Sequence, residues 1–513
     1  MAQYPSIFND VLGPIMRGPS SSHTAASVRI GSILRQLAKE QPKKLKAEFD
    51  PDGSLAATYH SQGADIGIAA GLLGIEMTDS KLLQSLELAE SQEIDISFDI
   101  VSFENSHPNT FRLSIENMKG KKHHVTALST GGGMIEFVEI DGFPISIKGD
   151  FYETLIRSAR PLEELSHFIH CESRIESSSM NSEFLYTIKT LQPLNSETIS
   201  QLYLLSSEKD IIELKPVLPI LAQIEESVPF ISAEDLLEFG KRENLSFWEL
   251  ALCYESMRGG IPETEVFEKM REIYHIMQNS VKEGLQGTEY DDRILGYQSH
   301  LMHNEKRKMP DDSFIREIIA YVTAIMEVKS SMGVIVAAPT AGSCGSLPGT
   351  LLAVGDQLQC SEDTMIKGLL AAGMIGVFIA KNGTFAAELG GCQNECGSGS
   401  GMAAAALVEL MDGTPQMAVD AASMALQNVI GMVCDPVAER VEVPCLGKNI
   451  MCGLNAFASA KMAIAGFDKV IPFDEVIKAM YLSGTLLPPE LKCTGNGGLS
   501  ITKTAQSIKN QLL

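Results

Sequence analysis

Residues 368–380 read GLLAAGMIGVFIA and residues 390–406 read GGCQNECGSGSGMAAAA, two stretches made mostly of small and apolar side chains. The first is the longest apolar run in the chain, and its 13 residues are too few to cross a bilayer, which takes about 20. We therefore expect a buried helix there. Small side chains let helix backbones approach closely, so the two stretches together predict a compact helical bundle.

Helix signals continue through the second half of the chain, from about residue 230 onward. Ser232 is followed by Asp235, and Ser246 by Glu249, which is the spacing of a capping box at the start of a helix. Apolar residues at helical spacing follow both pairs. The sequence therefore predicts a mostly α-helical domain over residues 229–513.

The first half of the chain shows a different pattern. Residues 94–104 (IDISFDIVSFE) and 110–118 (TFRLSIENM) alternate apolar and polar side chains, as half-buried strands do, and helical patches lie between such segments. This predicts an α+β domain over residues 1–150. Residues 151–228 are rich in Glu, Ser and Leu, and the strand-like stretch 184–194 (FLYTIKTLQPL) indicates a small α/β insertion or linker module with that strand between helices.

Charge and composition exclude several classes of function. The 513 residues include 65 acidic and 41 basic side chains, a net charge of −24, without a compensating basic run. Such a chain repels phosphate backbones and anionic lipid, so we expect neither a nucleic-acid nor a membrane partner. The first residues, MAQYPSIFND, lack the basic and apolar regions of a secretory signal, which favours a cytoplasmic location. In that reducing compartment the ten cysteines would be thiols.

Eight of the ten cysteines lie between residues 344 and 493. Among them Cys392 follows Gly391, Cys434 precedes Asp435-Pro436, and Cys445 follows Pro444, as residues in loops at helix ends do. Loops of this kind can direct several thiolates to one point, where backbone N–H groups stabilise negative charge. Three such thiolates suit an iron–sulfur cluster with one iron lacking a cysteine, or a metal site with one open position.

Ordinary burial is the alternative for each of these cysteines, because free cysteine behaves as a small hydrophobic residue. It is favoured for Cys360 and Cys452, which lie on helix-like runs without turn signals. The spacings of 42 and 11 residues between Cys392, Cys434 and Cys445 match no simple zinc or ferredoxin pattern. The spacing by itself therefore leaves both interpretations open.

Motifs in both halves resemble one enzyme family, the iron–sulfur-dependent L-serine dehydratases. Four segments resemble its α part: AAPTAGSCGSLPG (337–349), AAELGGCQNECGSG (386–399), CDPVAERVEVPC (434–445) and TGNGGLS (494–500). Four resemble its β part: GPSSSHTAA (18–26), GSLAATYHSQGADIG (53–67), HPNT (107–110) and STGGGMI (129–135). The resemblance implies a single chain with fused β and α parts, in which the 229–513 domain is catalytic.

The same resemblance implies a [4Fe-4S] cluster held by Cys392, Cys434 and Cys445. It also implies β-elimination of water from L-serine, giving pyruvate and ammonia, with the iron that lacks a cysteine acting as a Lewis acid on the substrate. Some relatives end in a further cysteine that can serve as a resting ligand. Here the corresponding place is near Ala505, and Cys493 is the possible substitute, although ordinary burial is the favoured interpretation for it.

Polar residues of the matched motifs are the candidates for the remaining roles. We expect catalytic roles for His23, Ser21, Ser22 and Lys381, and substrate contacts from Ser20, Thr24, Thr340, Ser343 and Asn382. Turn or capping chemistry is the alternative for each serine and threonine. Arg17, Arg440 and Lys448 are candidates to pair with the substrate carboxylate, with solvated or helix-terminal charge as the alternative.

Histidine suits the base that removes the α-proton because imidazole titrates near neutral pH. His23 and His60 are the candidates. The segment YHSQGAD stands where the family often carries a GKGH-like sequence, so His60 is displaced and Gln62 takes its place, which weakens a role for His60. His123 and His124, beside two lysines, indicate a solvated loop.

Three other functions remain in view. The GGG of STGGGMI could cradle the phosphate of pyridoxal phosphate, although no lysine near it lies in a Schiff-base motif. L-threonine or L-cysteine could be the true substrate, since one methyl group changes binding by only about 1–3 kcal/mol. The altered YHSQGAD segment and Cys396 also fit an amino-acid-binding regulatory protein with a degenerate catalytic half. For the enzyme we expect a small amino acid as ligand and a homodimer.

Overall fold

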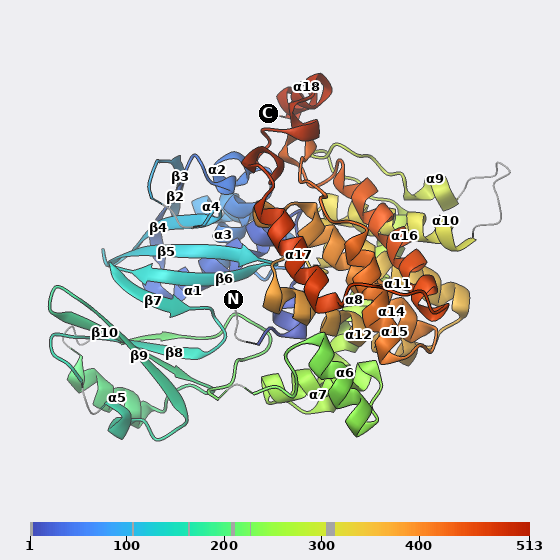
Figure 1. Ribbon diagram of the computed structural model, residues 1–513. Helices are drawn as coiled ribbons and strands as arrows, with labels where there is room; N and C mark the ends of the chain where they lie inside the picture. The colour runs from blue at the N-terminus through green and yellow to red at the C-terminus, as the bar shows by residue number, and fades with distance from the viewer. Residues whose placement is uncertain are drawn as a thin grey trace. The chain divides into compact units, whose positions relative to one another are not determined.

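The computed structural model describes residues 4–104, 107–162, 165–206, 211–225, 227–303 and 313–512. By their contacts the residues form two compact units (Figure 1). The helical unit comprises Met1–Ser22, Gly131–Gly133 and Ser227–Leu513, and the strand-rich unit comprises His23–Thr130 and Met134–Glu226. The expected division at residues 150 and 228 differs from these two units. It stays a prediction about domains, since contacts alone do not define what folds separately.

The strand-rich unit is built around a six-stranded sheet with the order β3-β2-β4-β5-β6-β7. The strands are β2 (Pro42–Phe49), β3 (Asp95–Ile100), β4 (Thr110–Asn117), β5 (Lys122–Gly131), β6 (Met134–Ile140) and β7 (Phe143–Ile147). The two segments predicted from alternation are β3 and β4, and along β4 every second side chain is buried. The helices α1 (Ala26–Ala38) and α3 (Ala64–Leu73) share a single core with the strands, which confirms the α+β class of this region.

Glycine allows α1 and α3 to pack backbone to backbone. A Cβ atom at Gly71 would lie 2.1 Å from the carbonyl oxygen of Val28, and one at Gly31 would lie 2.3 Å from that of Ile68. Any other residue would force the helices apart, because such distances are well below van der Waals contact. Two short helices, α2 (Ser54–Thr58) and α4 (Ser85–Ser91), complete this part of the unit.

A second, smaller sheet follows in the chain, with the order β11-β8-β10-β9 and antiparallel pairing throughout. Its elements are β8 (Tyr152–Ser158), β9 (Ser173–Met180), β10 (Glu183–Thr190), α5 (Ser196–Leu205) and β11 (Ile211–Leu214). The strand expected within 184–194 is β10. It lies between two strands rather than between helices, because it forms a hairpin with β9 and only α5 follows it.

His123 corrects one expectation from the sequence. It lies on β5 with its side chain 4% exposed, and its Nδ1 is 2.8 Å from Oδ2 of Asp141. The neighbouring lysines suggested a solvated loop. The alternation of a strand instead directs His123 inward while its neighbours point outward.

The helical unit consists almost entirely of α-helices, as the sequence predicts. They are α6 (Ala233–Glu243), α7 (Phe247–Gly259), α8 (Glu263–Gln286), α9 (Ser299–His303), α10 (Ser313–Ser330), α11 (Ser346–Leu358), α12 (Glu362–Asn382), α13 (Ala387–Gly390), α14 (Ser398–Leu410), α15 (Pro415–Gln427), α16 (Cys445–Ile464), α17 (Phe473–Thr485) and α18 (Lys503–Leu512). Figure 1 shows α12, α14, α15 and α16 gathered in one bundle. The four alanines 403–406 of α14 are completely buried there.

The apolar run 368–380 lies in α12. Among the residues that the structure describes, α12 is the one helix long and apolar enough to cross a membrane, and 83% of its most apolar window is buried inside the protein. Core helices of globular proteins pass the same test. The prediction of a buried helix is confirmed.

Residues 4–22 belong to the helical unit. Strand β1 (Ile15–Arg17) pairs antiparallel with β12 (Val334–Val336). Upstream, the Glu255 carboxylate accepts hydrogen bonds from Ser6 Oγ at 2.5 Å and from the Ile7 N–H at 2.8 Å. These contacts hold the chain start against α7 and β12. Because the two strands are antiparallel, the residues before β1 lie beside those after β12, and the Ala337 N–H donates to the Pro14 carbonyl at 3.1 Å.

Both predicted helix starts are present. Ser232 Oγ accepts the N–H of Asp235 at the start of α6. At α7, the N–H and Oγ of Ser246 both donate to Oε2 of Glu249, at 2.8 and 2.5 Å. These hydrogen bonds lower the pKa of Glu249 below its ordinary value.

We expect Ser246→Ala to reduce the free energy of unfolding of the helical unit by about 1 kcal/mol at pH 7, as loss of a cap does. The pKa of Glu249 is depressed in the folded state, so the bond stabilises above the ordinary carboxyl pKa and is lost as pH falls through the folded value. The difference from wild type should therefore shrink between pH 7 and pH 3 in denaturant titrations. An equal loss at both pH values would contradict this account, and the exposed Ser507→Ala serves as the control.

Candidate active site

The serine cluster after β1 lies against two distant segments of the helical unit. Ser21 Oγ accepts the backbone N–H of Ala341 at 3.3 Å, and Ser22 Oγ donates to the Glu388 carboxylate at 3.0 Å. Ser20 and Ser22 are joined by their hydroxyls at 3.2 Å. The structure thus brings the three predicted serines together with the loop after β12 and with α13.

The loop after β12 carries two more predicted residues, Thr340 and Ser343. Their hydroxyl oxygens lie 3.2 Å apart, and Thr340 Oγ1 donates to Oε1 of Glu395 at 3.0 Å. The side chain of Ser343 also reaches the carbonyl of Ala338, at 3.2 Å. Both hydroxyls are buried and engaged in capping, as the alternative from sequence expects. Their further role in binding substrate stays a prediction.

The glycines of STGGGMI also belong to the helical unit. Gly131, Gly132 and Gly133 have φ values of +112°, +60° and +83°, a backbone conformation that other residues adopt only under strain. A Cβ atom at Gly132 would lie 3.4 Å from the carbonyl oxygen of Pro339. This loop therefore brings its backbone, rather than side chains, close to the loop that carries Thr340.

Four buried cysteine thiols also belong to the helical unit and lie close to one another. Cys392, Cys434 and Cys493 form one buried cluster, and thiol hydrogen bonds join Cys434 to each of the other two. Two backbone bonds hold Cys493 in place, because the Cys434 N–H donates to the carbonyl of Leu491 at 2.9 Å and the Cys493 N–H donates to that of Cys434 at 3.0 Å. Cys445 is the first residue of α16, where the helix N-terminus favours a thiolate, although burial raises the pKa of this thiol.

Lys448 supplies a positive charge to this cluster. Its ammonium lies 3.6 Å from Cys392 Sγ and 2.9 Å from Oδ1 of Asp435. The pKa of Cys392 is lowered by its hydrogen bond with Cys434 and by the charge of Lys448. The pKa of Lys448 is raised, because the negative charges of Cys392 and Asp435 outweigh the desolvation of the ammonium. The cluster therefore contains one thiol prepared to lose its proton.

The buried thiols are donors of the kind that an iron–sulfur cluster takes, since such a cluster spreads thiolate ligands over several iron atoms. Within the described ranges, no group of three or more His, Cys, Asp or Glu side chains is arranged to hold one metal ion. Both interpretations from the sequence, a cluster and a metal site with one open position, stay predictions.

Glu395 is a site residue that sequence reasoning missed. It lies in the π-helical turn Gln393–Gly397 that leads into α14, and its partner is the hydroxyl of Thr340. Desolvation, followed by the charge of Cys392, raises its pKa well above the ordinary value, which favours the protonated form of the carboxyl group. One feature of the sequence could have revealed it: Glu395 directly precedes Cys396 in the quoted CQNECG.

Asn449 is a second missed residue. Its fully buried amide donates to the carbonyls of Gly342 and Cys445, at 2.8 and 2.9 Å. Its Oδ1 accepts from the N–H groups of Gly345 and Ser346, at 3.2 and 3.0 Å. One side chain thus joins the hydroxyl-bearing loop to the start of α16, where Cys445 lies.

His23 and Thr24 fall in the strand-rich unit. The Nε2 atom of His23 is 2.7 Å from Thr58 Oγ1, with the ring fully buried, and Thr24 Oγ1 donates to the carbonyl of Gln62 at 2.8 Å. His60 has its side chain 80% exposed, beside Asp65. The base assignment to His23 stays a prediction, and the exposure of His60 agrees with its weaker candidacy.

Lys381 and Asn382 end α12. The Lys381 ammonium lies 5.1 Å from the centre of the Tyr4 ring, and Asn382 Nδ2 donates to the carbonyl of Phe378 at 3.2 Å. These contacts involve the chain start and α12 itself, and the catalytic and binding assignments of the two residues stay predictions.

Two candidate carboxylate partners have described contacts of their own. Arg17 donates to the carbonyl of Met332 at 2.9 Å, and Arg440 pairs with Asp292 at 2.5 Å. Both guanidinium groups therefore fasten loops of the helical unit. The ammonium of Lys448, by contrast, lies beside the Cys392 thiol.

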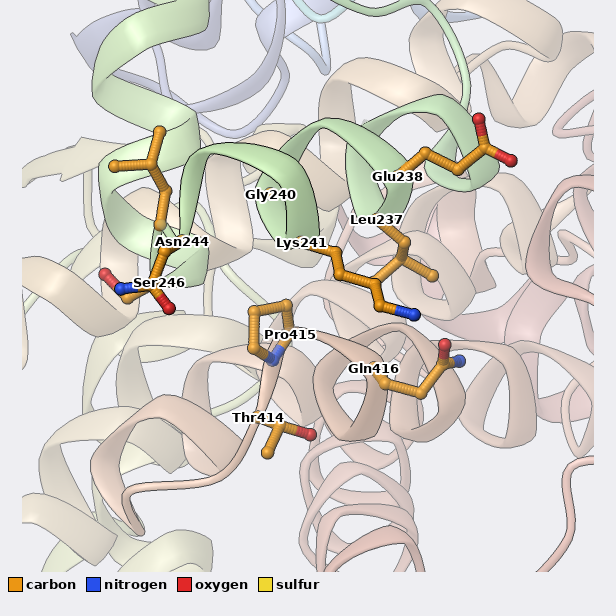
Figure 2. Close-up of a pocket in the computed structure, with 10 residues that line it drawn as sticks. Leu237, Glu238, Gly240, Lys241, Asn244, Ser246, Thr414, Pro415 and Gln416 are labelled. Carbon is orange, nitrogen blue, oxygen red and sulfur yellow. The ribbon is translucent and has the colours of Figure 1, made fainter.

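A groove of about 550 Å³ lies elsewhere in the helical unit, between α6 and the start of α15 (Figure 2). Lys241 and Gln416 lie toward one another across it, beside Pro415. None of the predicted site residues lines this groove. It is therefore separate from the hydroxyls and thiols described above.

Comparison with known proteins identifies the family. Residues 242–500 match the family described as serine dehydratase alpha chain, and residues 8–139 match serine dehydratase beta chain. The probable L-serine dehydratase alpha chain of Bacillus subtilis (strain 168) is 37% identical over 288 residues, which are 55% of this chain and 95% of that protein. The chain belongs to the L-serine dehydratase family. It carries beta-chain and alpha-chain regions in one polypeptide.

Two further relatives show how the regions are distributed. The probable L-serine dehydratase beta chain of Bacillus subtilis (strain 168) is 38% identical over 154 residues, 30% of this chain and 68% of that protein. The L-serine dehydratase of Helicobacter pylori (strain J99) is 26% identical over 514 residues, 94% of this chain and 96% of that protein. Every predicted site residue lies inside one of the two family regions.

We expect Asn449→Ala to destabilise the helical unit strongly. Each buried group left without a partner costs about 1–3 kcal/mol, so the loss should be about 3 kcal/mol or more. Denaturant unfolding measures it, and Asn428→Ala is the control, because Asn428 bonds Asn455 in an exposed pair and should change stability by about 0.5 kcal/mol or less. A loss at Asn449 no larger than at Asn428 would contradict the role given to Asn449.

Proposed function

We propose that the chain is an L-serine ammonia-lyase that eliminates water from L-serine with the help of a [4Fe-4S] cluster and gives pyruvate and ammonia. Its membership of the L-serine dehydratase family supports the substrate and the reaction class. The gathering of Cys392, Cys434 and Cys445 with Cys493 and Lys448 in one buried place supports the cofactor. A cytoplasmic location and a homodimer are proposed with it and rest on the sequence alone.

Cys392, Cys434 and Cys445 would hold the cluster. When bound, the group supplies an iron without a cysteine ligand, a Lewis acid that makes the substrate hydroxyl a better leaving group. Lys448 offsets the negative charge of the thiolates through its contact with Cys392. The start of α16 does the same for Cys445, because the partial positive charge of a helix N-terminus favours a thiolate there.

The hydroxyls nearby would hold the amino acid. Ser21, Ser22, Thr340 and Ser343 offer both donors and acceptors, and the backbone of residues 131–133 limits the space beside them. Their partners are fixed by hydrogen bonds, so they are oriented before substrate arrives, which lowers the entropic cost of binding. We propose that this hydroxyl cluster positions the substrate.

Glu395 is placed to donate a proton. Burial and the charge of Cys392 raise its pKa, which favours a protonated carboxyl group, and its hydrogen bond with Thr340 joins it to the hydroxyl cluster. A proton from Glu395 would convert the leaving hydroxide to water. The base that removes the α-proton would be a different group, and His23 remains the candidate.

We expect anaerobically purified protein to be brown, to contain about four irons and four sulfides per chain, and to convert L-serine to pyruvate. The single variants Cys392→Ser, Cys434→Ser and Cys445→Ser should each lose both iron and activity. Cys360→Ser is the matched control, because Cys360 lies outside the thiol cluster, and it should keep both. Full turnover by iron-free wild-type protein would refute the cofactor assignment.

Side-by-side turnover of L-serine, L-threonine and L-cysteine tests the substrate. We expect L-serine to have the highest kcat/KM, since the family is named for it. A higher value for either of the others would reassign the substrate while leaving the reaction class intact. Calorimetric binding of L-serine without release of pyruvate, in cluster-loaded protein, would instead favour the regulatory alternative.

Glu395→Gln tests the proton donor. The amide can still accept the hydrogen bond from Thr340 but cannot donate a proton as an acid does, so kcat should fall by about 100-fold or more with KM little changed. Wild-type kcat should fall as pH rises through the raised pKa of Glu395, and the variant should lack this limb. Glu409→Gln is the control, because burial raises the pKa of Glu409 to about 7 outside the site. An unchanged kcat for Glu395→Gln would remove Glu395 from the reaction.

A further inference from the structure

Lys329 is a fully buried lysine that the proposed reaction does not yet use. It lies in the last turn of α10 with 0% of its surface exposed, and its ammonium donates a hydrogen bond to the carbonyl of Val441. Among the residues that the structure describes, no carboxylate lies within ion-pair distance of this ammonium. A buried charge of this kind is costly unless an anion lies near it.

The surroundings of Lys329 place it beside the thiol cluster. Val441 lies in the segment between Cys434 and Cys445, so the hydrogen bond from Lys329 fastens the loop that carries two proposed ligands. One turn earlier on α10, Met326 accepts a hydrogen bond from the thiol of Cys344 at 3.8 Å. The same helix face thus contacts the loop after β12 and the loop before α16.

Three buried groups near Lys329 interact with its charge. They are the thiols of Cys344 and Cys445 and the carboxyl group of Glu395. Metal binding removes the proton from a cysteine ligand, so a bound cluster would add negative charge near this ammonium.

We propose that Lys329 is the buried counter-charge of the cysteine cluster: its ammonium stabilises the negative charge of the iron-loaded thiolates and fastens the loop between Cys434 and Cys445. This inference rests on the proposed function, because it requires that these cysteines hold the cluster. A bound cluster would set thiolate charge against this buried ammonium, so Lys329 favours the loaded protein. Lys329 is therefore a positioning and electrostatic residue rather than a ligand.

Two neutral variants test this role. Lys329→Gln removes the charge and keeps a donor for the Val441 carbonyl, whereas Lys329→Met removes both. Lys329→Arg keeps the charge, and Lys461→Met removes an exposed lysine from the last turn of α16 as a control. Each protein is reconstituted anaerobically with iron and sulfide. Four quantities are measured: iron and sulfide per chain, the half-time of iron loss to a chelator, the reduction potential of the cluster, and the thermal stability of the cluster-free protein.

We expect both neutral variants to retain iron about 10- to 100-fold less well than wild type, as when an outer partner of a metal site is removed. Their residual cluster should have a lower reduction potential, because the added electron loses a nearby positive charge. Cluster-free Lys329→Gln should be at least as stable as cluster-free wild type, since the unpaired charge is gone. Lys329→Arg should lie closer to wild type than either neutral variant, and Lys461→Met should match wild type.

Other outcomes would overturn the inference. If the neutral variants keep wild-type iron retention and potential but raise KM for L-serine, Lys329 binds the substrate carboxylate instead. If retention, potential and KM are all unchanged, Lys329 has only a structural role. If wild-type protein turns over L-serine without iron, the cofactor assignment itself fails, and this result is distinct from a defect confined to the Lys329 variants.

Discussion

The antiparallel pairing of β1 with β12 is the contact on which the candidate site depends. It joins two segments more than 300 residues apart in the chain, Ile15–Arg17 and Val334–Val336. A polar loop follows each strand, and Ser21 Oγ of the first loop accepts the N–H of Ala341 from the second. The Glu255 carboxylate secures the approach by capping the chain start. A shift of one residue along the pair would turn the side chains of β1 to the opposite face.

A polar site inside a nearly apolar bundle requires that its buried donors and acceptors find partners. Asn449 and Thr340 meet this requirement with neutral hydrogen bonds, and Lys448 meets it with a carboxylate and a thiol. The small residues of 390–406 make this possible, because α14 is buried along almost its whole length and leaves space for neighbouring side chains. Helix α14 therefore takes up little space, and polar side chains from several loops can pack beside it in fixed positions.

Local patterns in the sequence predicted the elements well. The apolar run 368–380, the alternation along β4 and the caps at Ser232 and Ser246 all depend on neighbours within one element, and each is confirmed. The prediction of a solvated loop at His123 was wrong because it relied on the neighbouring lysines and overlooked the alternation along Lys122–Gly131. The charge of neighbouring residues is a poor guide to the direction in which a side chain points.

The candidate site was only partly predictable. The resemblance selected Cys392, Cys434 and Cys445, and the structure places them near one another, but their roles as ligands stay predictions. Asn449, Glu395 and Lys329 were missed, since each acts through partners about 50 to 110 residues away that leave no periodic signal. The place of the first 22 residues in the helical unit was unforeseen for the same reason, because a three-residue strand is too short to read from sequence.

The position of β1 also bears on why one polypeptide carries both regions. Residues 4–22, at the N-terminal end of the chain, belong to the helical unit and include the three serines of the site. In a fused chain this pairing is intramolecular, so the effective concentration of β1 at β12 is fixed by the connecting segments and does not fall on dilution. Separate polypeptides would have to associate before the same strand pair could form. At low protein concentration the site would then lack the serines that follow β1.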